Sequence, residues 1–160
     1  MKSSARFTLL YSGKMHGWDV SDFHRLCDGK GPTVVLFRSS KGFKFGGFAS
    51  IPWASSGGWK EDKESFVFSV DSRELVFKPT DYSKSIYHSS TWGPNFGAHN
   101  LGFYNCQMNL INDGDCWINQ NVYTNIGCDS EGNHVLTGDG KGKGNNMKFT
   151  CTALEVYLVS

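Results

Sequence analysis

The chain has 160 residues, and 16 Lys and Arg against 15 Asp and Glu give it a formal net charge of +1 at pH 7. This length fits a single domain over residues 1–160 with one hydrophobic core. A nearly neutral chain offers no strong field to attract nucleic acid or an acidic membrane surface, so neither partner is expected. The 19 glycines and the 14% aromatic content are typical of short strands joined by many turns, and they argue against a helical bundle.

The compartment is predicted from the first residues and from the cysteines. Residues 1–11 lack the apolar core of a signal peptide, and no run approaches the roughly 18 apolar residues of a membrane span. The cysteines are widely spaced and odd in number, which favours free thiols in a reducing compartment over a disulfide framework. We therefore expect an intracellular, cytoplasmic protein without membrane insertion.

The first third of the chain predicts a short strand, one helix and an interior strand. Residues 7–11 form a short apolar run that fits either an opening strand or a segment clipped against the core. Asp19 can cap a helix whose apolar face carries Val20, Phe23, Leu26 and Cys27, and Gly29 can end it. Residues 33–38 are apolar on both faces. We expect that strand to be interior, covered by a second sheet on one side and by the helix on the other.

The stretch 41–58 is the one around which the chain is organised. Phe45, Gly47 and Ala49 alternate with Lys44, Gly46 and Phe48, which is the period of a strand. A turn at 39–42 pairs this strand with the preceding one as a hairpin. The adjacent glycines predict a bulge or a close approach of another element.

The remaining residues predict further strands and long loops. Strands are expected at 66–70, 75–77, 85–88 and 101–104, with turns at 92–97 and 138–146 and an Asn-rich loop at 105–120. Residues 147–159 predict one final strand that returns to the centre of a sheet. The chain is thus mainly β.

No motif predicts a metal, a cofactor or a catalytic centre. The cysteines lack the close spacing of a zinc site. The glycine-rich run 138–144 lacks the ending of a phosphate loop, and the acidic pairs near 113 and 129 lack the final Glu of a calcium loop. We also find no nucleophile elbow, so no catalytic residue is assigned.

Two polar residues remain candidates for special roles. His99, next to Asn100, lies in a turn of small residues that could hold a side chain in place, although a histidine bonded to the backbone explains the pattern as well. Glu155 interrupts an otherwise apolar strand face, so we expect a buried carboxylate that is either compensated or has a raised pKa. Hydrogen bonds from loop amides near the strand edge would compensate it.

Three tryptophans lie in predicted loops beside Gly, Ser or Pro. Such indoles serve either as interface anchors or as plugs of the core, and the sequence leaves both roles open. Together with the turn at 97–100 they give this set of candidate interaction residues: Trp53, Trp59, Trp92, His99 and Asn100.

Taken together, these residues resemble the TLDc family, and the order and spacing agree from about residue 7 to 159. The matching segments are Leu9-Leu-Tyr-Ser12, His16-Gly-Trp18, Phe23-His24-Arg25, residues 33–38, Phe45-Gly-Gly-Phe48, Pro52-Trp53, Phe96-Gly-Ala-His-Asn-Leu101, Cys116 and Leu154-Glu-Val-Tyr157. The Asn-rich stretch 105–121 is similar to the forms found in single-celled eukaryotes.

The resemblance implies a two-sheet antiparallel β-sandwich with one or a few peripheral helices. It also implies links to oxidative-stress resistance and to regulation of the vacuolar proton-pumping ATPase, whose subunits, or another large complex, would be the protein partner. Our first hypothesis is a non-catalytic protein-interaction domain. The alternative is a thiol-dependent antioxidant, which needs a cysteine of lowered pKa, and a weaker third option is glycan binding.

Overall fold

We analysed the protein as a computed structural model of the 160-residue chain. The structure describes residues 4–71, 75–97, 100–104, 106–109, 114–117, 122–123, 134–138 and 146–160, with backbone alone at 115–117 and 146–147.

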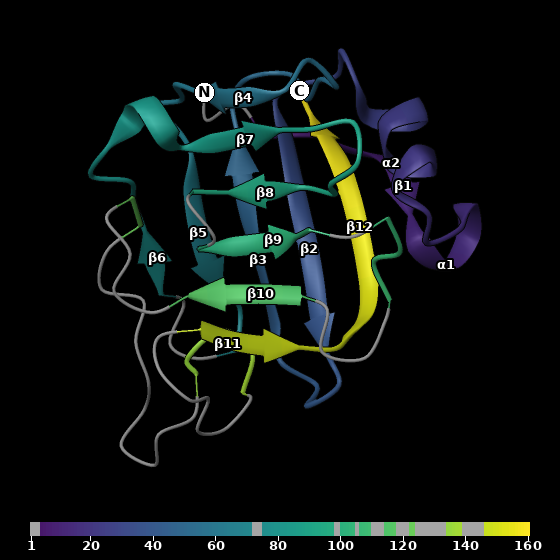
Figure 1. The fold of residues 1–160 in the computed structure, drawn as a ribbon, viewed down its shortest axis with the longest axis vertical. Helices are drawn as coiled ribbons and strands as arrows, with labels where there is room; N and C mark the ends of the chain where they lie inside the picture. Colours follow the sequence, from purple (N-terminus) through teal and green to yellow (C-terminus); the bar gives the residue numbers. More distant parts are fainter. Residues whose placement is uncertain are drawn as a thin grey trace.

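The first sheet has six antiparallel strands in the order β1, β12, β2, β3, β5, β6. Their bounds are β1 (Phe7–Ser12), β2 (Thr33–Ser39), β3 (Lys44–Ala49), β5 (Phe66–Ser69), β6 (Val76–Phe77) and β12 (Cys151–Val159). β12, the last strand, lies between β1 and β2 and pairs with both. The first sheet is therefore completed by the end of the domain (Figure 1).

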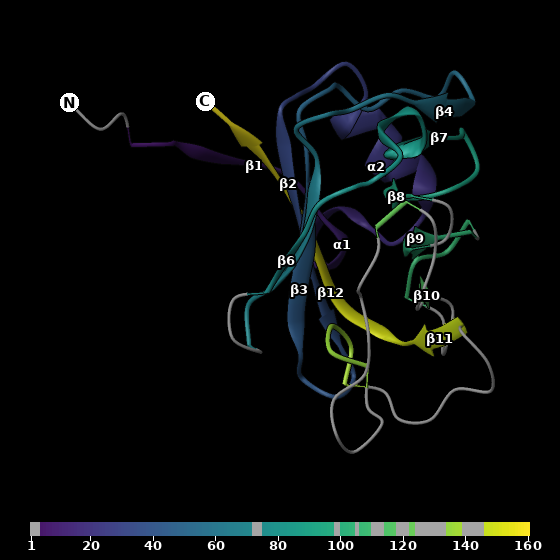
Figure 2. The same cartoon turned by 90° about the vertical axis from the view of Figure 1, so that its left-hand side faces the viewer.

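The second sheet has six short antiparallel strands in the order β11, β10, β9, β8, β7, β4. Their bounds are β4 (Gly58–Lys60), β7 (Ile86–His88), β8 (Asn95–Phe96), β9 (Leu101–Phe103), β10 (Gly114–Trp117) and β11 (Asn146–Phe149). Figure 1 shows these strands running crosswise to β12, β2 and β3, and Figure 2 shows the two sheets as separate layers. The predicted two-sheet antiparallel β-sandwich is confirmed.

Two short helices and one 3-10 turn complete the fold: α1 (Gly13–His16), α2 (Val20–Cys27) and η1 (Tyr82–Lys84). The predicted helix is confirmed as α2, because the Asp19 side chain accepts a hydrogen bond from the backbone N–H of Ser21 and so caps the first turn. Its buried face carries Val20, Phe23 and Cys27, as the periodicity predicted.

Aromatic side chains from both sheets fill the space between the layers. The rings of Phe37 and Phe45 on the first sheet stack at 5.5 Å, and Phe149 of the second sheet meets Phe45 edge-on at 5.2 Å. At the other end of the core, Trp53 contacts Phe96 of β8 at 5.7 Å. Burial of these large rings is the main force that holds the layers together.

The adjacent glycines of β3 mark close approaches and not a bulge. The pairing of β3 with both neighbours is regular. A Cβ on Gly47 would lie 2.4 Å from the ring of Phe96, and one on Gly46 would lie 2.2 Å from the carbonyl oxygen of Val35. Any side chain at Gly47 would therefore push the two sheets apart.

The position of the helix corrects one prediction. We expected the helix to cover the outer face of β2, but α2 lies on the same side of the first sheet as the second sheet (Figure 2). Its Phe23 ring meets Trp53 at 5.6 Å and Tyr11 at 6.0 Å, inside the core. Val34 and Leu36, on the other face of β2, stay half-buried, and Arg38 is exposed.

Three predictions about the second half were wrong. The expected turn at 92–97 contains the strand β8, and the expected loop at 105–120 contains β10. The expected single final strand is two strands, because β11 belongs to the second sheet and β12 to the first. The predicted turn at 138–146 lies mostly outside the described residues.

Candidate interaction surface

Four aromatic side chains form a continuous row on the outer face of the second sheet. They are Trp59 on β4, Tyr87 on β7, Trp92 in the following loop and Tyr104 just after β9. The ring centroids are 4.6 Å apart for Trp59 and Tyr87, 4.8 Å for Tyr87 and Trp92, and 4.6 Å for Trp92 and Tyr104. We call this row the aromatic surface.

The row faces away from the core because of the alternation along β7. Ile86 and His88 are buried between the sheets, so Tyr87 points outward. Trp59 is the direct cross-strand partner of Tyr87 and therefore shares its face. The Trp59 side chain is 39% exposed, so a large apolar ring is presented to solvent.

The rings hold one another in place. Trp59 meets Tyr87 at an interplanar angle of 70°, and Trp92 meets Tyr104 at 67°. These edge-to-face contacts contribute about 0.5–1.5 kcal/mol each beyond the area that they bury. A set of rings that is fixed before binding loses little conformational entropy when a partner docks.

Helix α2 anchors the loop that carries Trp92. The two ring nitrogens of His24 reach Asp28 Oδ1 at 2.8 Å and the carbonyl oxygen of Trp92 at 2.9 Å. The other carboxylate oxygen of Asp28 accepts a hydrogen bond from Ser55 Oγ at 2.5 Å. One polar cluster thus joins α2 to two loops, one of which carries Trp92.

A second set of contacts supports the same loop from behind. The Val20 N–H donates to the carbonyl oxygen of Cys106 at 2.8 Å, and the Met108 N–H donates to that of Trp18 at 3.0 Å. Met108 is fully buried, and a Cβ on Gly93 would lie 2.5 Å from its sulfur. The backbone after Trp92 therefore packs closely against the buried Met108 side chain.

The structure moves Trp53 from the surface to the core. Only 2% of this residue is exposed, and its indole N–H donates to Thr33 Oγ1 at 2.8 Å. Of the two roles left open by the sequence, Trp53 takes that of the core plug, since its indole fills the gap between α2 and β8. Trp59 and Trp92 remain at the surface.

The turn at 97–100 contributes nothing to the exposed surface in its described part. Asn100 is fully buried: its side-chain amide donates to the Tyr123 carbonyl and accepts from the Tyr123 N–H, both at 3.2 Å. Its assignment as an interaction residue is therefore wrong, because both of its hydrogen-bonding groups are used to clip the backbone at 123. His99 lies outside the described residues.

Glu155 is only half-buried and lies on the outer face of the first sheet. Its Oε2 accepts a hydrogen bond from the Tyr157 hydroxyl at 2.6 Å, and this bond raises the pKa of Tyr157. The prediction of a buried carboxylate bonded to loop amides was wrong, since the partner is a side chain of the same strand.

The described histidines form no catalytic arrangement. His24 and Asp28 resemble the acid–base pair of a hydrolase, but the Trp92 carbonyl occupies the nitrogen that would face a nucleophile. Burial lowers the pKa of His88 and of His134 to about 4. Neither ring nitrogen of His88 has a hydrogen-bond partner among the residues that the structure describes.

The described thiols are free, and two of the three are buried. Burial raises the pKa of Cys27 and of Cys151 to about 12, so neither forms the thiolate that reacts with peroxide near neutral pH. Cys106 is exposed and lies 3.9 Å from the carbonyl oxygen of Thr91.

The described residues contain neither a cluster of metal ligands nor a helix that could span a membrane. No three or more His, Cys, Asp or Glu side chains come together there as metal ligands. No described helix has the length and apolar character needed to cross a bilayer.

Sequence reasoning missed two members of the aromatic surface, Tyr87 and Tyr104. The only available signal was the outward position of Tyr87 in the predicted strand at 85–88. The side chains next to Tyr87 are determined by the pairing of β4 with β7, two strands that lie far apart in the chain.

Fold and surface together define a small two-layer β-sandwich domain that presents a row of aromatic rings on one outer face. The sequence model of the TLDc domain matches residues 1–160. The chain therefore belongs to the TLDc family.

Three relatives illustrate the range of similar proteins. The chain is 39% identical over 80 residues to the MTOR-associated protein MEAK7 of Danio rerio, covering 50% of this chain and 18% of that protein. It is 38% identical over 78 residues to the Gallus gallus protein of the same name, covering 49% and 17%. It is 27% identical over 138 residues to the oxidation resistance protein 1 of Bos taurus, covering 82% and 14%. The chain thus matches less than a fifth of the length of each relative.

Proposed function

We propose that this TLDc domain is a non-catalytic protein-interaction module that docks a partner protein on the aromatic surface. The observation that carries this proposal is the row of four touching rings, of which Trp59 is 39% exposed. Trp and Tyr are the residues that most often dominate the free energy of protein–protein binding, because they bury a large area with few rotatable bonds.

The family resemblance supplies the class of partner. We propose a large intracellular complex, with subunits of the vacuolar proton-pumping ATPase as the first candidates and a role in oxidative-stress resistance as the consequence. Two of the relatives carry the name MTOR-associated protein, so a complex that contains MTOR is the next candidate. The free thiols of Cys27, Cys106 and Cys151 suit the cytoplasm as the place of docking.

The thiol-dependent antioxidant is the alternative, and it has less support. It requires a cysteine of lowered pKa beside a cation or a helix N-terminus. Cys27 and Cys151 have raised pKa values instead. Only Cys106, among the described thiols, is exposed enough to react.

The test combines partner capture with matched substitutions. Wild-type protein is used to capture partners from the source cell, which mass spectrometry then identifies, and binding of the purified partner is measured for Trp59→Ala and Trp92→Ala. We expect each variant to weaken binding by about tenfold or more, since central aromatic anchors contribute about 2 kcal/mol or more.

Met15→Ala is the control, because Met15 is 70% exposed but lies on α1, away from the row. It should bind as wild type does. Unchanged binding by both tryptophan variants would reject the aromatic surface as the docking site. Peroxide consumption by the wild type that is lost in Cys106→Ser would favour the antioxidant instead.

A further inference from the structure

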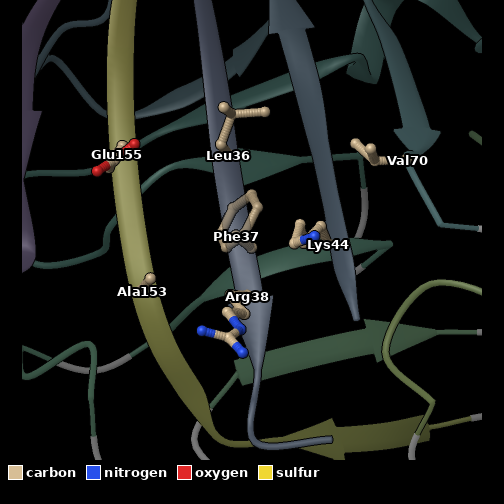
Figure 3. Close-up of a pocket in the computed structure, with 7 residues that line it drawn as sticks. All are labelled: Leu36, Phe37, Arg38, Lys44, Val70, Ala153 and Glu155. Atoms are coloured by element: carbon tan, nitrogen blue, oxygen red, sulfur yellow. The ribbon is translucent and has the colours of Figure 1, made fainter. Parts of the chain in front are cut away.

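The outer face of the first sheet carries a second, uncovered surface. Two depressions of about 420 Å³ and about 280 Å³ lie side by side and share Leu36 as a wall. The larger is lined by Phe7, Val34, Leu36, Phe68 and Tyr157, and the smaller by Leu36, Phe37, Arg38, Lys44, Val70, Ala153 and Glu155. We call the combined depression the outer groove (Figure 3 shows the smaller part).

The outer groove is unusually apolar for a solvent-exposed face. Phe7 is 57% exposed, Val70 48% and Val76 55%. Val76 pairs with Phe68, and Leu9, which is 37% exposed, pairs with Tyr157, so both residues share the face of the groove. Contiguous exposed apolar surface of this kind usually marks an interaction site.

Two opposite charges lie in the groove without an ion pair. Arg38 is exposed and takes part in none of the salt bridges between described residues. Glu155 uses Oε2 to accept from the Tyr157 hydroxyl, and its Oε1 makes no hydrogen bond within the described part of the chain. Lys44, by contrast, is paired with Asp71.

The strand register places these charges at opposite corners of a rectangle. Arg38 is paired with Ala153, and Leu36 with Glu155, all on the same face. Arg38 and Glu155 therefore lie on one diagonal, and Leu36 and Ala153 on the other, as Figure 3 shows. Diagonal neighbours on adjacent strands are about 7–8 Å apart.

This arrangement is self-complementary. A twofold axis parallel to the sheet and close to the Leu36–Ala153 diagonal maps Arg38 of one copy onto Glu155 of the other, and the reverse. The same rotation brings Leu36 against Leu36 at the centre, where the small Ala153 allows close approach. It also lays the Tyr157 end of each groove over the Val70 end of the other, so apolar surface meets apolar surface.

We propose that the occupant of the outer groove is a second copy of this domain, in a symmetric dimer joined by two reciprocal Arg38–Glu155 ion pairs around Leu36. The surface is separate from the aromatic surface, which lies on the other sheet and stays open to a different partner. The dimer would therefore present two aromatic surfaces, one on each side.

The size of the face sets the expected strength. Six strands about 4.8 Å apart and about four to six residues of 3.4 Å give a face of roughly 24 Å by 14–20 Å. This is smaller than the roughly 800 Å² per partner of a standard interface, so we expect a dissociation constant in the micromolar range.

The test is sedimentation of the wild-type domain from about 5 to about 500 µM, a range that brackets a micromolar Kd. Arg38→Glu and Glu155→Arg should each raise the Kd by about tenfold or more, because like charges then face each other twice. An equimolar mixture of the two variants should form a heterodimer, since every pair is again of opposite sign, and the double variant should dimerise as wild type does.

Lys63→Glu is the charge-matched control, since Lys63 is an exposed lysine outside the groove, and it should leave the Kd unchanged. Trp59→Ala should also leave it unchanged, which separates this proposal from the docking function. A wild type that stays monomeric over the whole range overturns the proposal. So does a dimer that tolerates Arg38→Glu, or a variant mixture that stays monomeric although thermal unfolding shows both variants folded.

Discussion

The outer faces of the two sheets both expose apolar side chains, but they differ in how those side chains are held. On the second sheet the aromatic rings contact one another, and hydrogen bonds from α2 fix the loop that carries Trp92. On the first sheet the groove is lined by aliphatic and aromatic side chains in equal number, and they flank two charges without ion pairs. The aromatic surface is ordered before a partner binds. The outer groove buries its apolar side chains only when another molecule covers it.

The difference follows from the side chains available to each face. On the second sheet the large rings fill the space between neighbouring strands by packing against one another. Val34 and Leu36 on β2 are too short to do so, and Gly46 on β3 has no side chain, although the Phe68 ring lies against it. We infer that a pre-ordered face suits recognition of an unlike partner, while a self-complementary groove suits a copy of itself.

The largest expected loss of stability comes from a substitution in the core between the two sheets. Trp53→Ala should lower the free energy of unfolding by about 3–5 kcal/mol, because it opens a cavity beneath both sheets and removes the donor to Thr33. Trp59→Ala, in the same segment but at the surface, should lower it by only about 1–2 kcal/mol, since it removes one ring contact and leaves no internal cavity. Urea unfolding checks the pair, and losses of equal size would contradict the placement of Trp53 in the core.

Acid should produce the next largest effect. Burial lowers the pKa of His88 and of His134 from 6.5 to about 4, so between these values the unfolded chain binds protons that the folded chain does not. Stability is therefore complete above pH 6.5 and falls as the pH drops toward 4, by up to about 3 kcal/mol for each histidine.

Urea unfolding between pH 7 and pH 4.5 measures this loss. His88→Gln should flatten the pH dependence, and hydrogen exchange should show faster opening of β7, beneath the aromatic surface, than of β2, beneath the groove. If the stability of His88→Gln depends on pH as that of the wild type does, then His88 takes up its proton in the folded state.

The smallest of the expected stability effects concerns the anchor of Trp92. His24→Ala removes the contacts to Asp28 and to the Trp92 carbonyl and should lower stability by about 1–2 kcal/mol. Because it frees the loop, it should also weaken partner binding, and the indole NH signal of Trp92 should broaden in NMR spectra.

Arg25→Ala on the same helix is its control. It removes only the exposed pair with Asp22, which is worth well under about 1 kcal/mol. Equal effects of the two substitutions would show that His24 acts through the helix and not through Trp92.

The sequence predicted the elements in which local pattern and burial agree. A few neighbouring residues are enough to predict three of them: β3 from its alternation, β2 from its two apolar faces, and α2 from its Asp19 cap. β8 and β10 were missed because strands of two and four residues rich in Gly, Asn and Asp carry no visible alternation. The break between β11 and β12 was missed because the apolar pattern runs through Thr150, where the chain passes from one sheet to the other.

The candidate site was harder to predict because it depends on pairings between distant segments. Trp59 and Trp92 could be named as loop indoles, but their joining through Tyr87 requires the register of β4 against β7. Trp53 and Asn100 looked similar to the others in sequence, and only the tertiary contacts put them inside. Their neighbours along the chain, Pro52 and Ala54 for Trp53 and His99 and Leu101 for Asn100, do not distinguish a buried position from an exposed one.

The place of β12 has a consequence for how the domain is made. β1 and β2 flank it and do not pair with each other, so the first sheet stays split until residues 151–159 have been translated. Translation at about 5–20 residues per second takes on the order of ten seconds to proceed from β2 to the end of β12. During this interval the edges of β1 and β2 that will pair with β12 stand open on the nascent chain, and open strand edges of this kind favour pairing with other chains.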